Sequence, residues 1–240
     1  MRLYGRNSIK ERLKADAKSI KKIFLQKDAD VSDIISMARP HHIPIEYLAK
    51  NEFQKSAQDN RTQGVIADIG EFKYTYLEDI LNLPKEKYPS ILFLDSLNDP
   101  QNLGGILRTA ACFGGFAVVL PKHDSVEVTE AVLRVAQGGE NYVPIAKVTN
   151  LATAIDKSKK AGYWIAGAVI EGGNDLTSTS LNFPLGIIIG SEGKGIRPGL
   201  ISHIDFKITL PMKGVELSFN AAVAAALFCY EITRQKALLC

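Results

Sequence analysis

Residues 98–115, NDPQNLGGILRTAACFGG, place polar groups at the start of an otherwise apolar helical pattern. Asp99 or Asn102 can cap this helix, and the pair Gly104–Gly105 lets a second backbone or a phosphate approach closely. The free N–H groups of a helix start favour anions. Arg108 follows Asn102 by six residues, about one and two-thirds turns, and its planar fork can bind a phosphate. A capped helix whose arginine extends to the surface explains the same residues equally well.

A second unusual loop follows an apolar strand in residues 185–200, LGIIIGSEGKGIRPGL. It contains Glu192, Lys194 and glycines spaced GxxGxG, whereas a dinucleotide-binding loop has the spacing GxGxxG. Lys194 is not followed by Ser or Thr, which excludes a phosphate-binding P-loop. A tight turn before a helix explains this loop at least as well as a ligand site does.

A third loop lies in residues 208–228, ITLPMKGVELSFNAAVAAALF. Ser218 or Asn220 can cap the helix that follows, and the many alanines of that helix permit close packing against a neighbour. Capping alone would explain these two residues. The presence of all three loops, in order and each at the end of a predicted strand, is what favours a functional site.

The segments between these loops predict an α/β protein. Apolar strands and helices alternate from residue 91 onward, which is typical of a mostly parallel sheet covered on both faces. Ligands of such sheets bind beyond the carboxyl ends of the strands. Strands are predicted at 91–95, 116–120, 143–148, 163–170, 185–190 and 206–210, and helices at 104–114, 128–139, 150–162 (with Asn150 as N-cap) and 219–238.

The first 73 residues form a separate small α/β unit by the same criteria, followed by a linker at 74–90 with two prolines and a second domain at 91–240. Helices are predicted at 8–15 and 31–42, where Pro40 stops the second, and strands at 20–26, 43–49 and 64–70. The unit is basic, which suits a nucleic-acid partner, although charge alone favours a solvated face. The basic residues are Arg2, Arg6, Lys10, Arg12, Lys14, Lys18, Lys21, Lys22, Arg39 and Arg61.

The composition is that of an ordinary globular protein, with 46% hydrophobic and 23% charged residues, and the net charge of +3 permits a nucleic-acid partner without requiring one. Cys112 and Cys229 lie in apolar helical patterns and are expected to be buried, and the absence of CxxC predicts a reducing, cytoplasmic compartment. No signal peptide or membrane span is expected. His41 and His42 have no partners at metal-ligand spacing, so no metal site is expected.

Three motifs, taken together, resemble the SpoU/TrmH family of SPOUT-class RNA 2′-O-ribose methyltransferases. They are N-x-G-x-x-x-R-T-A from Asn102, I-I-G-S-E-G-x-G around Gly190 to Gly195, and L-P-M…L-S-F-N-A-A-V-A from Leu210 to Ala224. The stretches YGRNSIKERL and TQGVIADI resemble the substrate-binding domain of that family. The overall resemblance is closest to the branch that modifies a guanosine in 23S ribosomal RNA, while the transfer-RNA and antibiotic-resistance branches share the motifs.

The resemblance implies a deep trefoil knot in the C-terminal domain, a homodimer with the active site near its interface, and S-adenosylmethionine as cofactor. The implied reaction is methyl transfer to a ribose 2′-hydroxyl in structured RNA, most simply 23S rRNA. A transfer-RNA 2′-O-methyltransferase and a non-catalytic RNA-binding protein of the same fold are the alternatives. A nicotinamide-dependent oxidoreductase is disfavoured by the spacing and position of the glycines.

The resemblance also assigns roles by position. A guanidinium does not normally give up its proton, so Arg108 is expected to bind the adjacent phosphate and stabilise the developing alkoxide. Phe219 stands where the family commonly has Leu, a change that alters pocket shape more than chemistry. The residues implied for catalysis are Asn102, Arg108, Glu192, Ser218 and Asn220, and those implied for cofactor binding are Gly167, Gly190, Leu210, Met212 and Phe219.

Overall fold

The N-terminal part of the chain folds around a four-stranded sheet with the order β1-β4-β2-β3. The computed structural model describes residues 1–57, 62–84, 87–212, 214 and 217–239. Strands β1 and β2 run antiparallel to β4, and β3 runs parallel to β2. The elements are β1 (Arg2–Tyr4), α1 (Arg6–Asp16), η1 (Ala17–Ser19), β2 (Ile20–Gln26), α2 (Ser32–Ala38), η2 (Arg39–His41), β3 (Ile45–Leu48), α3 (Lys50–Ser56) and β4 (Val65–Ile69).

Every helix and strand predicted for this unit is present, and three further elements appear, namely β1, η1 and α3. Strand β1 has three residues, too few for an alternating pattern to show in the sequence. Helix α3 begins after Ala49, whose backbone N–H donates to the Glu52 carboxylate at 3.2 Å. Helix α2 ends at Ala38, two residues before Pro40, as expected from the steric effect of proline.

The C-terminal part folds around a seven-stranded sheet with the order β7-β6-β5-β10-β8-β11-β9, in which every pairing is parallel. Its strands are β5 (Ser90–Leu94), β6 (Phe116–Pro121), β7 (Ile145–Val148), β8 (Trp164–Ala168), β9 (Asn174–Asp175), β10 (Leu185–Ile189) and β11 (Phe206–Thr209). Its helices are α5 (Pro100–Phe113), α6 (Glu130–Ala136), η4 (Gly139–Asn141), α7 (Leu151–Lys160), α8 (Pro198–Ile201) and α9 (Ala221–Ala237). The α/β class and the parallel sheet are confirmed.

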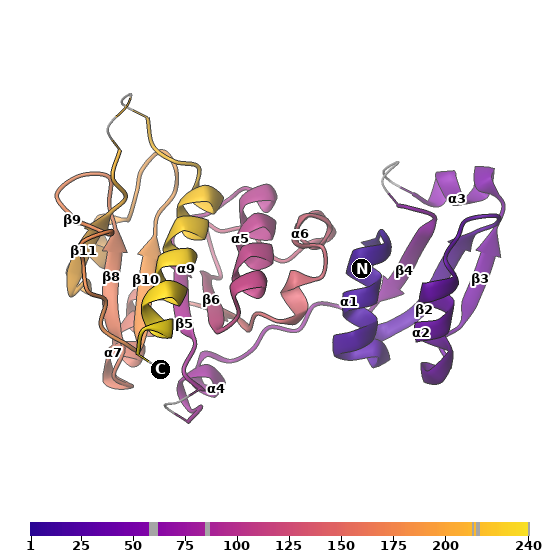
Figure 1. Cartoon of the computed structure of the whole chain (residues 1–240), viewed down its shortest axis with the longest axis horizontal. Coiled ribbons are helices and arrows are strands. Elements are labelled where there is room, and N and C mark those ends of the chain that lie inside the picture. The colour runs from indigo at the N-terminus through magenta and orange to yellow at the C-terminus, as the bar shows by residue number, and fades with distance from the viewer. Residues whose placement is uncertain (58–61, 85–86, 213, 215–216, 240) are drawn as a thin grey trace.

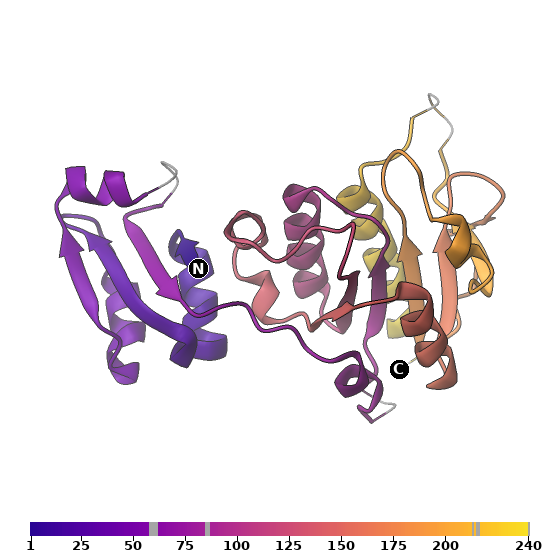
Figure 2. The same ribbon diagram turned by 180° about the vertical axis from the view of Figure 1, so that it is seen from behind.

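Helices cover both faces of this sheet, which explains why its strands read as continuous apolar runs. In β5, Leu92 and Leu94 belong to the core beneath α5, α6 and α9, while Ile91 and Phe93 belong to the core beneath α4 (Leu77–Leu81), α7 and α8. Figure 1 shows α9, α5 and α6 side by side on one face. The reverse view in Figure 2 shows the opposite face, where α7 lies.

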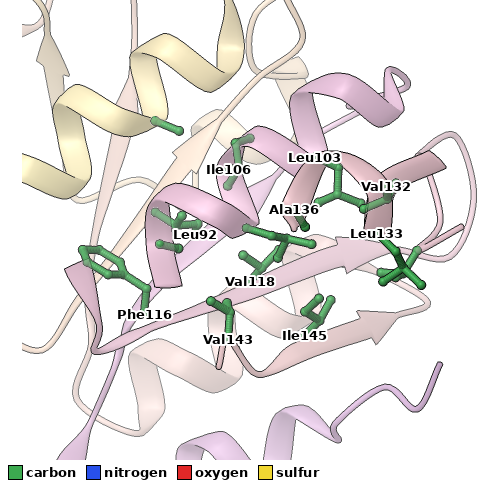
Figure 3. Packing of buried hydrophobic residues seen from close by; sticks show 14 of the residues in the cluster. Leu92, Leu103, Ile106, Phe116, Val118, Val132, Leu133, Ala136, Val143 and Ile145 are labelled. Carbon is green, nitrogen blue, oxygen red and sulfur yellow. The ribbon is translucent and has the colours of Figure 1, made fainter. Parts of the chain in front are cut away.

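The core beneath α5 and α6 is tightly packed. Figure 3 shows Leu103 and Ile106 of α5 and Val132 and Leu133 of α6 above Val118 of β6. These five side chains are at most 1% exposed. Such packing holds α5, and therefore the polar residues along it, in one position relative to the sheet.

The segment at 74–90 contains more structure than a simple linker. Helix α4 buries Leu77, Ile80 and Leu81 in the second core, and Thr75 forms a parallel bridge with Ala146 of β7. The chain therefore joins the C-terminal sheet before β5 begins. The boundaries at 73 and 90 stay predictions, as does the knotted path of the chain. Among the described residues, no helix has the length and apolar character needed to cross a membrane.

Candidate active site

The three unusual loops meet at one edge of the C-terminal sheet. Strand β5 leads into α5, β10 into the loop 190–197, and β11 into the loop that precedes α9. Strands β5 and β10 are neighbours, and β8 separates β10 from β11. Because parallel strands end at the same edge, loops from distant parts of the sequence converge there.

Asn102, Glu192 and Asn220 form one hydrogen-bonded cluster at this edge. The side-chain amide of Asn102 donates to Glu192 Oε1 at 3.0 Å. The amide of Asn220 donates to the same oxygen at 2.6 Å and to Asn102 Oδ1 at 2.8 Å. Asn102 is only 4% exposed. One residue from each loop thus contributes to a single polar site.

The same cluster caps helix α9. Asn220 Oδ1 accepts from the backbone N–H groups of Ala222 at 2.9 Å and Val223 at 3.3 Å, and Glu192 Oε1 accepts from that of Ala221 at 3.2 Å. A carboxylate at a helix N-terminus is favoured by the helix dipole. Of the two caps proposed for α9, Asn220 is the correct one. The cap of α5 is Asp99, which accepts from Gln101 N at 2.8 Å.

The loop that carries Glu192 is held at both ends. Gly190 lies so close to the backbone of Gly195 that a Cβ atom on it would come within 2.1 Å of the Gly195 carbonyl carbon. Ser191 and Gly195 exchange two backbone hydrogen bonds, at 2.9 and 3.2 Å. Close backbone contact of this kind requires glycine at position 190.

An ion pair between a buried aspartate and a partly exposed arginine anchors the far end of the loop. The fully buried Asp95 accepts from the backbone N–H of Arg197 at 2.8 Å and from its Nε at 2.6 Å. The sequence reasoning missed both residues. The available signal was an aspartate directly after a wholly apolar strand, because a buried carboxylate needs a partner.

Beside the cluster lies a cavity that is open to solvent. Four of the five residues proposed for cofactor binding line it, namely Gly190, Leu210, Met212 and Phe219. Gly167 does not, because it faces the opposite side of the sheet, where an added Cβ would meet Ile204 at 2.4 Å. The neighbouring residues that do line the cavity from β8 and its loop are Ala168, Val169 and Ile170.

Of the five residues proposed for catalysis, Ser218 and Glu192 line the cavity, and Asn102 and Asn220 bond to Glu192. Arg108 lies on another side of α5. An added Cβ on Gly139 would come within 2.9 Å of Arg108 Cα, so η4 packs against the helix at that point. The side chain of Arg108 is exposed and forms no hydrogen bond or ion pair with the part of the chain that the structure describes.

The paired glycines of α5 allow two other helices, and not a ligand, to pack closely against α5. An added Cβ on Gly104 would lie 2.5 Å from Val135 Cβ, and one on Gly105 would lie 3.2 Å from Ala222 Cβ. Gly104 therefore allows α6 to approach, and Gly105 allows α9. Of the two interpretations of this pair, the close approach of other chain segments is the one that the structure shows.

One of the two cysteines expected to be buried is not. Cys112 is exposed on α5, whereas Cys229 is buried in α9, where burial raises the pKa of its thiol to about 12. Position 112 falls near the end of α5, where the helix face turns away from the sheet. His41 and His42 are exposed, and the described residues contain no group of three potential metal ligands.

The basic residues of the N-terminal unit divide into two groups. Arg2, Arg6, Lys10, Arg12, Lys14 and Lys22 form ion pairs with carboxylates. Lys18, Lys21 and Arg39 are exposed, without an ion pair in the described part of the chain. Arg61 lies outside the described residues. The solvated-face interpretation thus applies to part of the charge only, since three cations stay available to a polyanion.

Comparison with known proteins finds a matching family model for each of the two parts of the chain. Residues 89–230 match the model of the SpoU rRNA Methylase family, and residues 2–75 match the model described as RNA 2′-O ribose methyltransferase substrate binding. The TrmH family protein YacO of Bacillus subtilis is 35% identical over 237 residues, covering 97% of this chain and 94% of the relative.

Solved structures share the whole fold. The SpoU methyltransferase AviRb from Streptomyces viridochromogenes, in complex with AdoMet, has a TM-score of 0.82 at 19% identity, covering 99% of this chain and 90% of that one. The AdoMet-bound rRNA methyltransferase from Sinorhizobium meliloti has a TM-score of 0.80 at 21% identity, with 97% and 86% covered. The two family models that match this chain, and the relative that is similar over almost its whole length, show that the chain belongs to the SpoU/TrmH family of RNA methyltransferases.

Proposed function

We propose that this enzyme transfers a methyl group from S-adenosylmethionine to a ribose 2′-hydroxyl of structured RNA, with 23S rRNA as the substrate. The cluster of Asn102, Glu192 and Asn220 at the edge of the cavity is the observation that carries the proposal. It is supported by the N-terminal match to a 2′-O ribose methyltransferase substrate-binding domain. In AviRb, a protein of the same fold, AdoMet is the cofactor.

The lining of the cavity suits the cofactor, because small-molecule sites are mostly apolar with a few polar groups. Leu210, Met212 and Phe219 supply apolar surface for an adenine ring, and the glycine at 190 keeps the strand end free of a side chain. When bound, S-adenosylmethionine supplies a methyl group on a positively charged sulfur, which departs as a neutral thioether.

The polar cluster orients the reacting groups. Of the six hydrogen bonds within the cluster and to the start of α9, three are accepted by Glu192 Oε1, one by Asn102 Oδ1 and two by Asn220 Oδ1. None of these six bonds between described residues uses Glu192 Oε2, which can therefore meet a ribose hydroxyl. Two amides hold the carboxylate in place. Fixed geometry of this kind brings the nucleophile into line with the methyl carbon before reaction. Ser218, on the cavity wall, adds a hydroxyl beside the same space.

Arg108 acts on the RNA rather than on the cluster. The helix carries it about 9 Å along the axis from Asn102 and onto a different side, because six residues separate the two. Its exposed guanidinium binds the phosphate next to the target ribose and stabilises the negative charge that develops on the 2′-oxygen. The phosphate or a water molecule accepts the proton, since the guanidinium does not give up its own.

The N-terminal domain, residues 1–73, binds the RNA by recognising its shape and contacting its phosphates. It thereby presents one unpaired nucleotide to the C-terminal domain, residues 91–240. The exposed cations Lys18, Lys21 and Arg39 contribute to this grip. The knot expected in the C-terminal domain belongs to the same proposal. Its support is that one cavity is lined by Gly190 and Glu192 together with Leu210, Ser218 and Phe219, which lie about twenty residues or more further along the chain.

The proposed enzyme is a homodimer, and the surface of α9 supports this part of the proposal. Val223, Leu227 and Tyr230, spaced by four and three residues, form an apolar stripe and are 47%, 40% and 57% exposed. The Tyr230 ring contacts that of Phe113, itself 37% exposed, at 6.4 Å. In Figure 1 this helix covers the sheet with its outer side uncovered. A second copy of the chain, related by a twofold axis, covers both stripes at once.

Leu227→Glu is expected to convert the dimer into a monomer, because it places a charge in the centre of the apolar stripe. Size-exclusion chromatography with light scattering measures the mass directly. Tyr76→Glu is the matched control, since Tyr76 is 76% exposed but lies directly before α4, which covers the other face of the sheet. A Leu227→Glu protein that keeps twice the chain mass would contradict the proposed interface.

Methyl transfer to separate RNA pools tests the function. Purified protein is incubated with S-adenosylmethionine carrying a radiolabelled methyl group and with 23S rRNA, 16S rRNA or transfer RNA, all from cells that lack this enzyme. Label in alkali-resistant dinucleotides of 23S rRNA is the expected result, because a 2′-O-methyl group blocks alkaline cleavage. Label on transfer RNA would support the tRNA enzyme instead, and cofactor binding without label on any pool would support a non-catalytic RNA-binding protein.

A further inference from the structure

The N-terminal domain is docked on the C-terminal domain through α6 and η4. The backbone N–H of Arg2 donates to Glu130 Oε1 at 2.8 Å, and the guanidinium of Arg134 lies 5.0 Å from the ring centre of Tyr4. Figure 1 shows α1 beside α6, at the end of the C-terminal domain where α5 also lies. The domains therefore contact one another through defined residues, besides being joined by the chain.

The most deeply buried of these contacts is an ion pair between Arg12 of α1 and Glu140 of η4. Arg12 Nη2 lies 3.3 Å from Glu140 Oε1, and the two side chains are 11% and 0% exposed. Two of their polar atoms, Arg12 Nε and Glu140 Oε2, have no hydrogen-bond partner among the residues that the structure describes. Burial raises the pKa of the Glu140 carboxyl, and the nearby Arg12 offsets only part of this effect.

A buried ion pair of this kind is not an efficient way to stabilise the folded protein. Removing two charges from water is unfavourable, and apolar residues of similar size at the same place are often equally or more stabilising. A buried ion pair does, however, restrict geometry, because its strength depends steeply on the distance and direction between two specific groups. The arrangement favours a role in fixing how the two domains sit against each other.

The segment that carries Glu140 also touches the helix that carries Arg108. Two glycines precede Glu140. An added Cβ on Gly138 would lie 2.5 Å from Glu11 Cβ of α1, and one on Gly139 would lie 2.9 Å from Arg108 Cα. Residues 138–140 are therefore clamped between α1 and α5. A displacement of α1 is transmitted through this segment to the backbone at Arg108, because close-packed groups cannot yield independently.

We infer that Glu140 is a positioning residue for methyl transfer: by pairing with Arg12 it holds the RNA-binding domain in register with Arg108. RNA gripped by the N-terminal domain then presents the phosphate of its target nucleotide to the Arg108 guanidinium. The inference rests on the proposed function, because it assumes that Arg108 meets the RNA. It names Glu140 and Arg12, which lie outside the three motifs, as residues that affect catalysis without touching substrate or cofactor.

The experiment compares Glu140→Gln, which removes the charge and keeps the size, with the wild type. Expected results are a kcat for 23S rRNA lowered about tenfold, affinities for RNA and for S-adenosylmethionine within twofold of wild type, and a broadened small-angle scattering profile, which reports looser docking. Arg12→Lys, which keeps the charge, should retain more than a third of the wild-type kcat. Glu46→Gln is the matched control, because it breaks an exposed ion pair with Lys22 in the same domain, away from α6 and η4, and should change nothing.

A double variant separates positioning from stability. Arg12→Met with Glu140→Leu replaces the pair by apolar side chains, so its melting temperature should return to within a few degrees of wild type while kcat stays low. Wild-type kcat in Glu140→Gln, or in the double variant, would overturn the inference. Failure of the proposed function looks different, because the wild-type protein itself would then transfer no methyl to any RNA.

Discussion

Arg108→Ala is expected to lower kcat for RNA methylation by roughly two to three orders of magnitude, which corresponds to about 2.7–4 kcal/mol of lost transition-state stabilisation. The reason is that the arginine neutralises charge only as it develops on the ribose oxygen. Arg108→Lys should lose most activity as well, because an ammonium is a point charge without the planar fork that binds a phosphate at two points.

The same variants should bind S-adenosylmethionine normally and unfold at the wild-type temperature. Arg108 does not line the cavity, and its side chain is exposed without an ion pair in the described part of the chain. Single-turnover methyl transfer measures the rate, and calorimetric titration measures the cofactor affinity. Lys160→Ala, an exposed cation on α7 across the sheet, is the control for loss of surface charge. An Arg108→Ala enzyme with half the wild-type rate would remove Arg108 from the mechanism.

Gly190→Ala is expected to weaken cofactor binding at least tenfold, or by about 1.4 kcal/mol. The added methyl group would lie 2.1 Å from the carbonyl carbon of Gly195 and 2.4 Å from the nitrogen of Ile196. Both are backbone atoms, so the turn must move as a unit. That movement displaces Glu192 from Asn220 and changes the wall of the cavity.

Calorimetric titration with S-adenosylmethionine measures this effect directly. Gly193→Ala provides a matched control in the same loop, because a Cβ at Gly193 meets nothing within 4 Å and the residue has no positive φ. This control should bind the cofactor with wild-type affinity. Equal affinities of the Gly190→Ala and Gly193→Ala proteins would show that the close contact at position 190 does not shape the cofactor site.

Much of the local structure is determined by the sequence near each residue. The continuous apolar run ILFLD predicted a strand buried on both faces, and β5 is such a strand. Asn150 was expected to cap a helix, and its side chain accepts from Thr153 N at 3.1 Å. Burial on a strand and capping at a helix start depend on residues a few positions away, so a pattern in the sequence is enough to reveal them.

The direction in which two residues face depended on the packed fold instead. Cys112 follows an apolar helical pattern but lies where the face of α5 turns to solvent. Gly167 lies in the expected strand but faces Ile204 rather than the cavity. On a strand, an assignment that is wrong by one position places a residue on the opposite face of the sheet. On a helix, a small rotation moves a residue from the buried to the exposed side. The apolar pattern at these two positions is not sharp enough to exclude such errors.

The sequence by itself therefore determined most of the elements, the fold class and, through three motifs in order, the family to which the enzyme belongs. Only the tertiary structure decided which side chains meet. Glu192 bonds to Asn102, 90 residues away, because β10 lies beside β5 in the sheet, and Arg12 pairs with Glu140 across 128 residues because the two domains dock. Such contacts arise from the order of strands and the packing of domains, which are properties of the whole chain and of no local pattern.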